Sequence, residues 1–461
     1  MFYEQRKTIT REGVMNLTSR KNLAVKILSI FTAFLFCGAT AGSADVSQAA
    51  FDQLLKTNKE LLETVTKLSK KVDNLEGRVD QAERTQQPAS VAAPTGGEPG
   101  DGVLRTQGGD IQLSGFVDTS FNWNLRTPPT PAGGTNATGN STLRAFDRES
   151  NTFDVNNIQL NIKRPAPENG GVGFTTEFVY GTDAQVIESA GFLGGTDEFS
   201  IQEAFVELKA PIGSGLTVWI GKFATLHGAE VIESYMNWNA SRGLLFNNAI
   251  PFTHTGIRAF YNWLDGKVTT GLGLVNGWDN VIDNNNFKDI EAMVKWTPSE
   301  NFSIAQNFMV GSQIVEDQGD MRYLFDTVAT WVPLPNDLPK LTLMANFDYG
   351  TEERLGKISP ALEGGPADWQ GYALYAKYDL YDWLTLAARW EQFWDDQGAR
   401  TGTAALNQLW EMTYTADFKV YKNLLTRLEY RHDNADSKTA FDGGTAQNQD
   451  TVGASFIYLF G

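Results

Sequence analysis

Thr451 to Phe460 reads T-V-G-A-S-F-I-Y-L-F, with one residue after it. Successive side chains of a strand point to opposite sides, so one face of this segment carries only apolar or small groups: Val452, Ala454, Phe456, Tyr458 and Phe460. Such a final strand is typical of a membrane barrel, in which the last strand pairs with the first so that no edge is left in lipid. A buried strand of a sandwich has the same pattern, so the rest of the chain must decide.

The alternation recurs from Asp110 to the end of the chain. Brief connections such as 211–215 alternate with long ones such as 126–150. Short turns on one side, long loops on the other and an even strand count are typical of outer-membrane barrels with both ends in the periplasm. The sequence therefore predicts an all-β fold, a closed antiparallel transmembrane β-barrel of about 16 strands over 110–461. The sixteen segments are 111–125, 151–164, 172–182, 199–210, 216–222, 253–263, 267–277, 288–297, 301–311, 321–332, 340–350, 368–380, 383–394, 406–420, 424–433 and 450–460.

The charged side chains of these segments fall on the face opposite the apolar one, and aromatic residues gather at strand ends as in interfacial girdles. In a water-soluble sandwich the charged face would lie outside, but sixteen strands are too many for one sandwich. We therefore expect the charges to face the lumen. They are Asp118, Lys163, Glu177, Glu207, Lys209, Arg258, Glu291, Lys295, Asp348, Lys377, Asp379, Arg389, Glu391, Glu411, Asp417, Lys419, Arg427, Glu429 and Arg431.

The first residues predict export. Ten apolar residues, 27–36, follow basic residues and precede small ones, which is the pattern of a secretory signal and too short to span a bilayer. We assign 1–44 to the signal peptide, with Met15 as the expected true start. The single cysteine, Cys37, lies in this signal, so the mature chain has no disulfide. The net charge of -17 argues against nucleic acid as a partner.

Residues 45–85 carry a seven-residue apolar repeat that predicts a periplasmic α-helical coiled coil, and its broad stripe fits three strands better than two. The alternative is an amphipathic helix against the protein's own body. Residues 86–109 contain Pro, Gly and small polar residues without a period and are predicted to be a flexible linker. The expected coiled-coil core comprises Leu54, Asn58, Leu61, Val65, Leu68, Val72, Leu75 and Val79.

Five stretches of the predicted barrel resemble a known family. They are G-F-V-D-T-S-F-N-W-N-L (115–125), G-K-F-A-T-L-H-G-A-E-V-I-E-S (221–234), N-W-N-A-S-R-G-L-L-F (237–246), A-I-P-F-T-H-T-G-I-R (249–258) and V-N-G-W-D-N-V-I-D-N-N (275–285). This pattern is similar to the OmpL-like family of β-barrel porins and covers roughly 110–461. The resemblance implies an outer-membrane porin and no particular substrate.

A barrel of this size leaves an aqueous channel, and whatever narrows it decides selectivity. The long connection 223–252 is rich in apolar residues and is predicted to fold into the lumen, with His227, Glu230, Glu233 and Arg242 lining or bracing a constriction. Capping the outer mouth or packing at a trimer interface is the alternative. The mixed signs of the inward charges predict a weak cation preference rather than an anion-selective channel.

The sequence contains candidates for two further kinds of site. The segment 278–286 has carboxylate and amide oxygens that suit Ca²⁺, although turns use the same residues for backbone reasons. The three histidines, His227, His254 and His432, lack the G-x-S-x-G context of acyl-transfer enzymes. We therefore predict no metal, no cofactor and no enzymatic activity.

Taken together, these patterns predict a passive outer-membrane porin for small hydrophilic solutes and ions. It is expected to be a homotrimer in outer-membrane lipid, held by barrel contacts and by the periplasmic coiled coil. A substrate-specific channel is one alternative. The other is a structural tether in which the coiled coil contacts peptidoglycan and the barrel acts as anchor.

Overall fold

The computed structural model describes residues 103–106, 109–126, 141–190, 198–316, 319–353, 365–402, 408–442 and 444–461. The predicted signal peptide (1–44), the predicted coiled coil (45–85) and most of the predicted linker (86–109) lie outside these residues.

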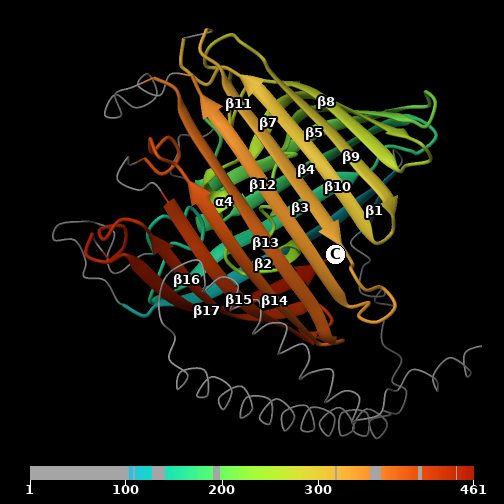
Figure 1. Ribbon diagram of the computed structural model, residues 1–461. Coiled ribbons are helices and arrows are strands. Elements are labelled where there is room, and N and C mark those ends of the chain that lie inside the picture. The colour runs from blue at the N-terminus through green and yellow to red at the C-terminus, as the bar shows by residue number, and fades with distance from the viewer. Residues whose placement is uncertain are drawn as a thin grey trace, which may run out of the picture. The chain divides into compact units, whose positions relative to one another are not determined.

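Sixteen antiparallel strands, β2 to β17, form a closed wall (Figure 1). The closing pair is β17 with β2, in which Phe460 lies opposite Gly115 and Thr451 opposite Asn124. The predicted sixteen-strand barrel is confirmed, because every strand has a neighbour on both sides and no edge is exposed to lipid. The strands are β2 (Gly109–Asn124), β3 (Thr152–Arg164), β4 (Gly171–Tyr180), β5 (Phe199–Ala210), β6 (Leu216–Ala224), β7 (Thr253–Trp263), β8 (Val268–Val275), β9 (Asp289–Ser299), β10 (Phe302–Gly311), β11 (Arg322–Trp331), β12 (Leu341–Glu352), β13 (Ala367–Tyr381), β14 (Leu384–Trp394), β15 (Gln408–Tyr421), β16 (Leu424–Ala435) and β17 (Asn448–Phe460).

Burial along the strands is inverted relative to a water-soluble protein. On β17 the outward side chain of Tyr458 is 52% exposed, whereas on β16 the inward side chain of Arg431 is 1% exposed. Large apolar side chains lie on the outside of nearly every strand and charged ones lie inside, which is the arrangement that lipid outside and a polar interior require.

The end of the predicted linker differs from the expectation. Val103–Thr106 forms a short strand, β1, which pairs with β2 from Gly109 to Gln112. This part of β2 extends beyond Gly115, where its pairing with β17 ends. Without β1, this edge of β2 would have no hydrogen-bonded neighbour, and β1 pairs with it.

Short turns join the strands at one end of the barrel and long loops join them at the other. Three of the long loops are named loop 1 (125–151), loop 2 (181–198) and loop 3 (225–252). Loop 2 contains helix α3 (Thr182–Ile187), and loop 3 contains the 3-10 turn η1 (Ser234–Met236) and helix α4 (Leu244–Asn248). None of the helices in the described residues is long and apolar enough to cross a membrane.

The apolar core of the molecule lies inside the barrel, where loop 3 packs against the wall. The buried loop residues include Ile232, Leu244, Leu245 and Phe246, which join the inward side chains of several strands in one cluster. These apolar residues explain why the loop does not remain in water. Gly243 allows loop 3 to approach the wall closely, since a Cβ atom there would collide with the carboxylate of Glu391 on β14.

Candidate functional site

Loop 3 is bonded to the inward side chains of strands on two sides of the barrel. On β5, Gln202 donates to the carboxylate of Glu233 at 2.5 Å. On β12, the side chain of Asn346 accepts a bond from the Ala229 amide at 3.2 Å. The loop therefore spans the interior instead of lying along one strand pair.

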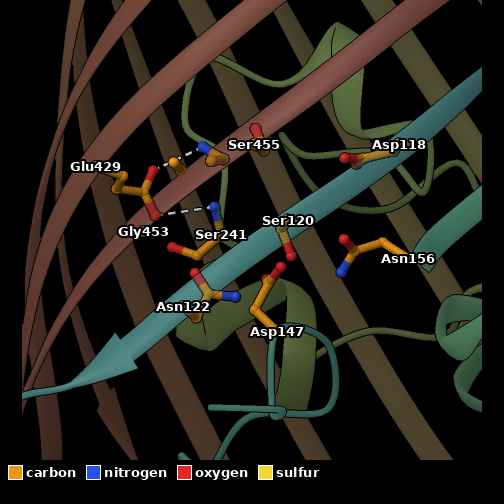
Figure 2. A pocket seen from close by; sticks show the side chains of 11 residues that line it. Asp118, Ser120, Asn122, Asp147, Asn156, Ser241, Glu429, Gly453 and Ser455 are labelled. Atoms are coloured by element: carbon orange, nitrogen blue, oxygen red, sulfur yellow. Dashed lines mark hydrogen bonds between the residues drawn. The ribbon is translucent and has the colours of Figure 1, made fainter. Parts of the chain in front are cut away.

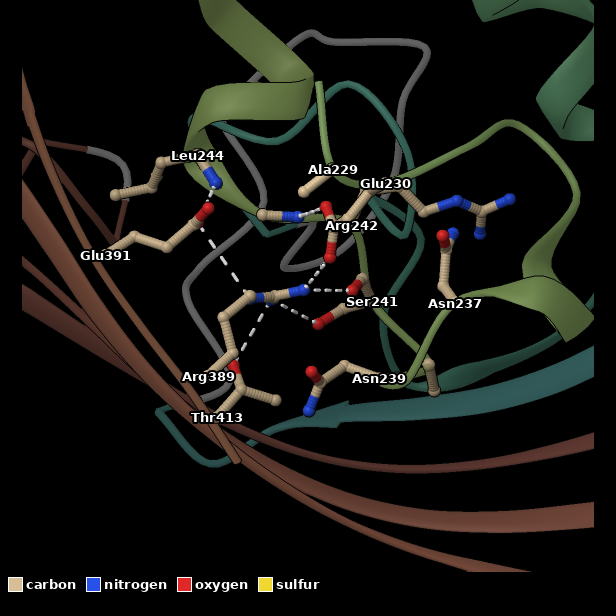
Figure 3. A network of polar contacts seen from close by, with 12 residues as sticks. Ala229, Glu230, Asn237, Asn239, Ser241, Arg242, Leu244, Arg389, Glu391 and Thr413 are labelled. Atoms are coloured by element: carbon tan, nitrogen blue, oxygen red, sulfur yellow. Dashed lines mark hydrogen bonds and ion pairs between the residues drawn. The ribbon is translucent and has the colours of Figure 1, made fainter. Parts of the chain in front are cut away.

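Arg389 on β14 is the centre of a dense polar network (Figure 3). Its guanidinium donates to the Glu230 carboxylate at 2.6 Å, to the Ser241 carbonyl at 2.6 Å and to Glu411 on β15 at 2.7 Å. The neighbouring Glu391 accepts a bond from the Leu244 amide. All of these carboxylates are buried, so the single guanidinium compensates charges from both the wall and the loop.

Side chains of strand β16 bind backbone groups of loop 3. The guanidinium of Arg427 donates to the carbonyls of Ser234 and Asn237, at 2.7 and 2.8 Å, and pairs with Asp417 at 3.0 Å. Glu429 on the same strand accepts the amides of Ala240 and Ser241, at 2.6 and 2.9 Å.

The wall arginines are thus bound by carboxylates and by loop carbonyls. Arg431 completes the row, with bonds to the Arg242 carbonyl at 2.6 Å and to Asp433 at 2.8 Å. Because several N–H donors of each guanidinium group are bonded, these arginines position loop 3.

Arg242 of loop 3 links the three long loops. It contacts Asp183 of α3 at 3.3 Å and lies 3.9 Å from Asp147 of loop 1. Its backbone amide donates to the Asp147 carboxylate at 3.0 Å. Burial raises the pKa of Asp183 to about 8, although Arg242 lowers it, and nearby carboxylates add to the rise.

His227 lies at the start of loop 3 and is buried. Its Nδ1 and the Nε2 of His254 both lie within bonding distance of the Thr225 hydroxyl, at 3.1 and 3.2 Å. Burial, with a smaller contribution from His254, lowers the pKa of His227 to about 3, so the ring is neutral at physiological pH.

The four residues predicted to form a constriction therefore have different surroundings. Glu230 and Arg242 are buried and brace the loop, and His227 is buried where the loop leaves β6. Glu233 is partly exposed.

The other predicted lumen charges are distributed around the wall. Arg258 and Glu291 form a buried two-point pair, at 2.6 and 2.9 Å. Lys377 lies 4.8 Å from the ring of Trp238 in loop 3, and Asp379 accepts the Thr385 hydroxyl at 2.6 Å. The Lys295 side chain is exposed and Asp118 is buried.

The candidate calcium segment uses its carboxylates for local structure. Asp279 accepts the amides of Phe252 and Thr253, both at 2.8 Å. Asp283 accepts the amide of Asn285 at 2.9 Å and pairs with Lys288. In the described residues, no group of three or more His, Cys, Asp or Glu side chains is arranged to hold a metal ion.

Loops 1 and 2 contribute residues that the sequence did not single out. Arg144 of loop 1 pairs with Asp433 on β16 at 2.5 Å and donates to the Thr451 hydroxyl at 3.1 Å. Asp147 and Asp183 contact Arg242, as described above. Loop residues have no period, so no sequence pattern identified them.

The comparisons with known proteins agree with this geometry. Residues 110–460 match the family model described as "Putative beta-barrel porin-2, OmpL-like". No match was found among curated proteins.

Several solved structures share the fold. Salmonella typhi OmpF, in complex with daunomycin, is 14% identical, with a TM-score of 0.52 over 78% of this chain and 100% of that one. Pseudomonas putida OprB is 10% identical, with a TM-score of 0.51 over 76% and 94%. The outer membrane channel DcaP of Acinetobacter baumannii is 13% identical, with a TM-score of 0.50 over 77% and 99%. At these identities the likeness shows the barrel fold alone.

The family match covers the sixteen strands of the barrel and the loop inside it. The chain therefore belongs to the OmpL-like family of β-barrel porins, which are outer-membrane channels for small solutes.

Proposed function

We propose that this porin allows passive diffusion of small hydrophilic solutes and ions, that loop 3 narrows its channel, and that it weakly prefers cations. The observation that carries the proposal is the set of bonds between loop 3 and the inward side chains of β5 and β12 to β16. A loop bonded to so many strands reduces the cross-section available to solutes.

The pairing of the wall charges favours a general channel over a specific one. A phosphate- or sulfate-selective pore needs a ladder of arginine or lysine side chains that face the solute. Here Arg258, Arg389 and Arg427 each form a short ion pair with a wall carboxylate. With the wall arginines compensated and a chain charge of -17, the remaining field favours cations weakly.

Single-channel recording in planar bilayers tests this proposal. With a KCl gradient, we expect large conductance steps and a reversal potential that indicates weak cation preference. Small, saturable or anion-selective steps would contradict it and favour the second candidate, a substrate-specific channel.

We also propose that three chains associate through barrel contacts and through a periplasmic coiled coil at 45–85. The seven-residue repeat supports this part of the proposal, and these residues lie outside the described ones. Chemical crosslinking of the mature protein should give a three-chain species. A clean monomer band with residues 45–85 intact would reject the trimer.

The coiled coil also supports the structural alternative, a tether to peptidoglycan. Deletion of residues 45–85 separates the two roles. Loss of envelope integrity with unchanged solute permeability would favour the tether, and unchanged integrity would reject it.

A further inference from the structure

A small polar pocket lies at the seam where the barrel closes. Figure 2 shows it between β2, which carries Asp118 and Ser120, and β17, which carries Ser455. Asn156 of β3, Asp147 of loop 1, and Ala240 and Ser241 of loop 3 complete the lining. Its volume is about 20 Å³, enough for one water molecule or a small ion.

Several polar atoms of this pocket have no hydrogen-bond partner in the described residues. They are Asp118 Oδ1, Ser120 Oγ, Asn156 Oδ1 and Ser455 Oγ. Each of the four residues is more than nine-tenths buried. Buried polar atoms in proteins are almost always bonded, so a cluster of unpartnered ones indicates a place for water or for a ligand.

Local backbone features create this cluster. Asp118 of β2 pairs with Asn157 of β3, whereas the next residue, Thr119, pairs with Val155. The register between the two strands therefore shifts by one residue at this point. Asn156 is the extra residue of this bulge, and its side chain lies in the pocket. On β17, Gly453 leaves the space open, since a Cβ atom there would collide with the Asn122 side chain.

The chemistry of the lining favours a cation. The lining includes the carboxylates of Asp118, Asp147 and Glu429, and no lysine or arginine is among the described residues that form it. Glu429 is already bonded to two loop amides and Asp147 to the amide of Arg242, which leaves Asp118, with the hydroxyl and amide oxygens, as the main candidate ligand. Hard cations such as K⁺, Na⁺ and Ca²⁺ are bound by oxygen ligands of these kinds.

Two arginines lie near the pocket. Arg242 contacts Asp183 and the Ile232 carbonyl and lies 3.9 Å from the lining carboxylate of Asp147, and Arg427 contacts Asp417 and loop carbonyls. Both nevertheless attract Asp118 electrostatically. This attraction weakens the affinity of Asp118 for another cation, and a channel needs a site from which the ion can leave.

Two further cavities lie toward the two ends of the barrel. At the short-turn end, a cavity of about 170 Å³ is lined by Ser114, Asn161 and Tyr235. At the long-loop end, Asp147 also lines a third cavity, with Asp154 and Asp183. Asp147 lines both the acidic pocket and the cavity at the long-loop end, so these two polar spaces adjoin.

We propose that the pocket around Asp118 is a weak, exchangeable binding site for small cations on the route through the lumen. The placement on a route depends on the proposed channel function, whereas the binding of a cation does not. The two can therefore be tested separately.

Binding is measured with Tb³⁺, an oxygen-seeking cation whose luminescence is sensitised by nearby aromatic side chains. The folded barrel in detergent is titrated as wild type, as Asp118→Asn and as the matched control Asp382→Asn, which removes the same charge in the exposed turn between β13 and β14. Asp118→Asn should weaken Tb³⁺ binding at least about ten-fold, because a lost ligand costs no less than a lost supporting contact. The control should bind like wild type, and both K⁺ and Ca²⁺ should compete.

A second variant guards against misfolding. Ser455→Ala removes a neutral oxygen without changing any charge, and we expect about five-fold weaker binding. Equal Tb³⁺ affinity in wild type, Asp118→Asn and Ser455→Ala would overturn the site and leave a water-filled pocket only. Conductance is recorded on the same preparations. If the wild type binds Tb³⁺ but does not conduct, the channel function is rejected and the cation site is retained. If the wild type conducts but all variants bind Tb³⁺ with equal affinity, the cation site is rejected and the channel function is retained.

Discussion

Two adjacent parts of the lumen wall use their buried polar groups differently. On β14 to β16, the guanidinium groups of Arg389, Arg427 and Arg431 are bonded to carboxylates and loop carbonyls. At the seam of β2, β3 and β17, carboxylate, amide and hydroxyl atoms lack partners in the described residues. A buried charge with several partners supports structure, whereas buried polar atoms without partners leave room for water or solute. We call the first region the arginine wall and the second the seam.

The largest effect is expected from Arg389→Met on the arginine wall. The substitution approximately keeps side-chain volume but takes the nearest cation from the buried carboxylates of Glu230, Glu391 and Glu411, of which only Glu411 still pairs with Arg431, and this should cost about 3 to 5 kcal/mol of unfolding free energy. Urea titration of the refolded protein in lipid vesicles, followed by tryptophan fluorescence, measures this loss.

The same substitution at exposed Arg126 is the control for Arg389→Met and should change stability by less than about 0.5 kcal/mol. If Arg389→Met is as mild as the control, the carboxylates around Arg389 do not need it, and the contrast between the two regions fails.

Arg427→Lys tests whether the planar geometry of the guanidinium group, as well as its charge, is needed to bind loop 3. A lysine retains the charge and the attraction to Asp417, but one ammonium group cannot reach the carbonyls of Ser234, Tyr235 and Asn237 together. We expect a loss of about 1 to 3 kcal/mol and noisier, larger single-channel currents as loop 3 loosens. Arg126→Lys is the matched control. Wild-type currents in Arg427→Lys would show that these bonds do not hold the loop.

A pH titration examines the long-loop cavity next to the seam through Asp183, whose pKa burial raises to about 8. Arg242 of loop 3, Asp147 of loop 1, Asp118 of β2 and Asp154 of β3 are the charged groups that act on it. Below pH 8 Asp183 is mostly neutral, and above pH 8 it adds a negative charge beside the long-loop cavity. The cation-to-anion permeability ratio should therefore rise roughly two-fold between pH 6 and pH 9. Reversal potentials measure this rise, and an equal rise in Asp183→Asn would assign it to another group.

The barrel was predictable from sequence because its determinants are local. A period of two, aromatic residues at strand ends and turn residues between them identify each strand without reference to its neighbours. The pattern in β14 also separates inward Arg389 and Glu391 from outward Leu386 and Trp390, since alternation fixes one face once the other is apolar.

The contacts inside the barrel could not be predicted in the same way. Arg389 meets Glu230 across 159 residues, and only the closed barrel brings them together. Arg427 binds backbone carbonyls, which every residue type has, so loop 3 contains no sequence signal for this contact. Asn156 lines the seam because of a register shift, and a register shift depends on two strands at once.

The smallest effect is expected from Asp118→Asn at the seam, and for that reason it is the most informative comparison with the arginine wall. Asp118 Oδ1 has no partner in the described residues, so replacing the carboxylate by an amide of the same shape breaks no bond at that atom. The substitution also removes a buried charge. Burying a charge that is not fully compensated costs free energy, so this removal favours the folded state. The unfolding free energy should therefore stay within about 0.5 kcal/mol of wild type or rise slightly, while Tb³⁺ binding weakens. Urea titrations of Asp118→Asn, Asp382→Asn and Arg427→Lys in one series measure the difference. A loss in Asp118→Asn as large as that in Arg427→Lys would mean that the seam, like the arginine wall, holds the barrel together, and the distinction between a structural and a solute-facing side of the lumen would no longer stand.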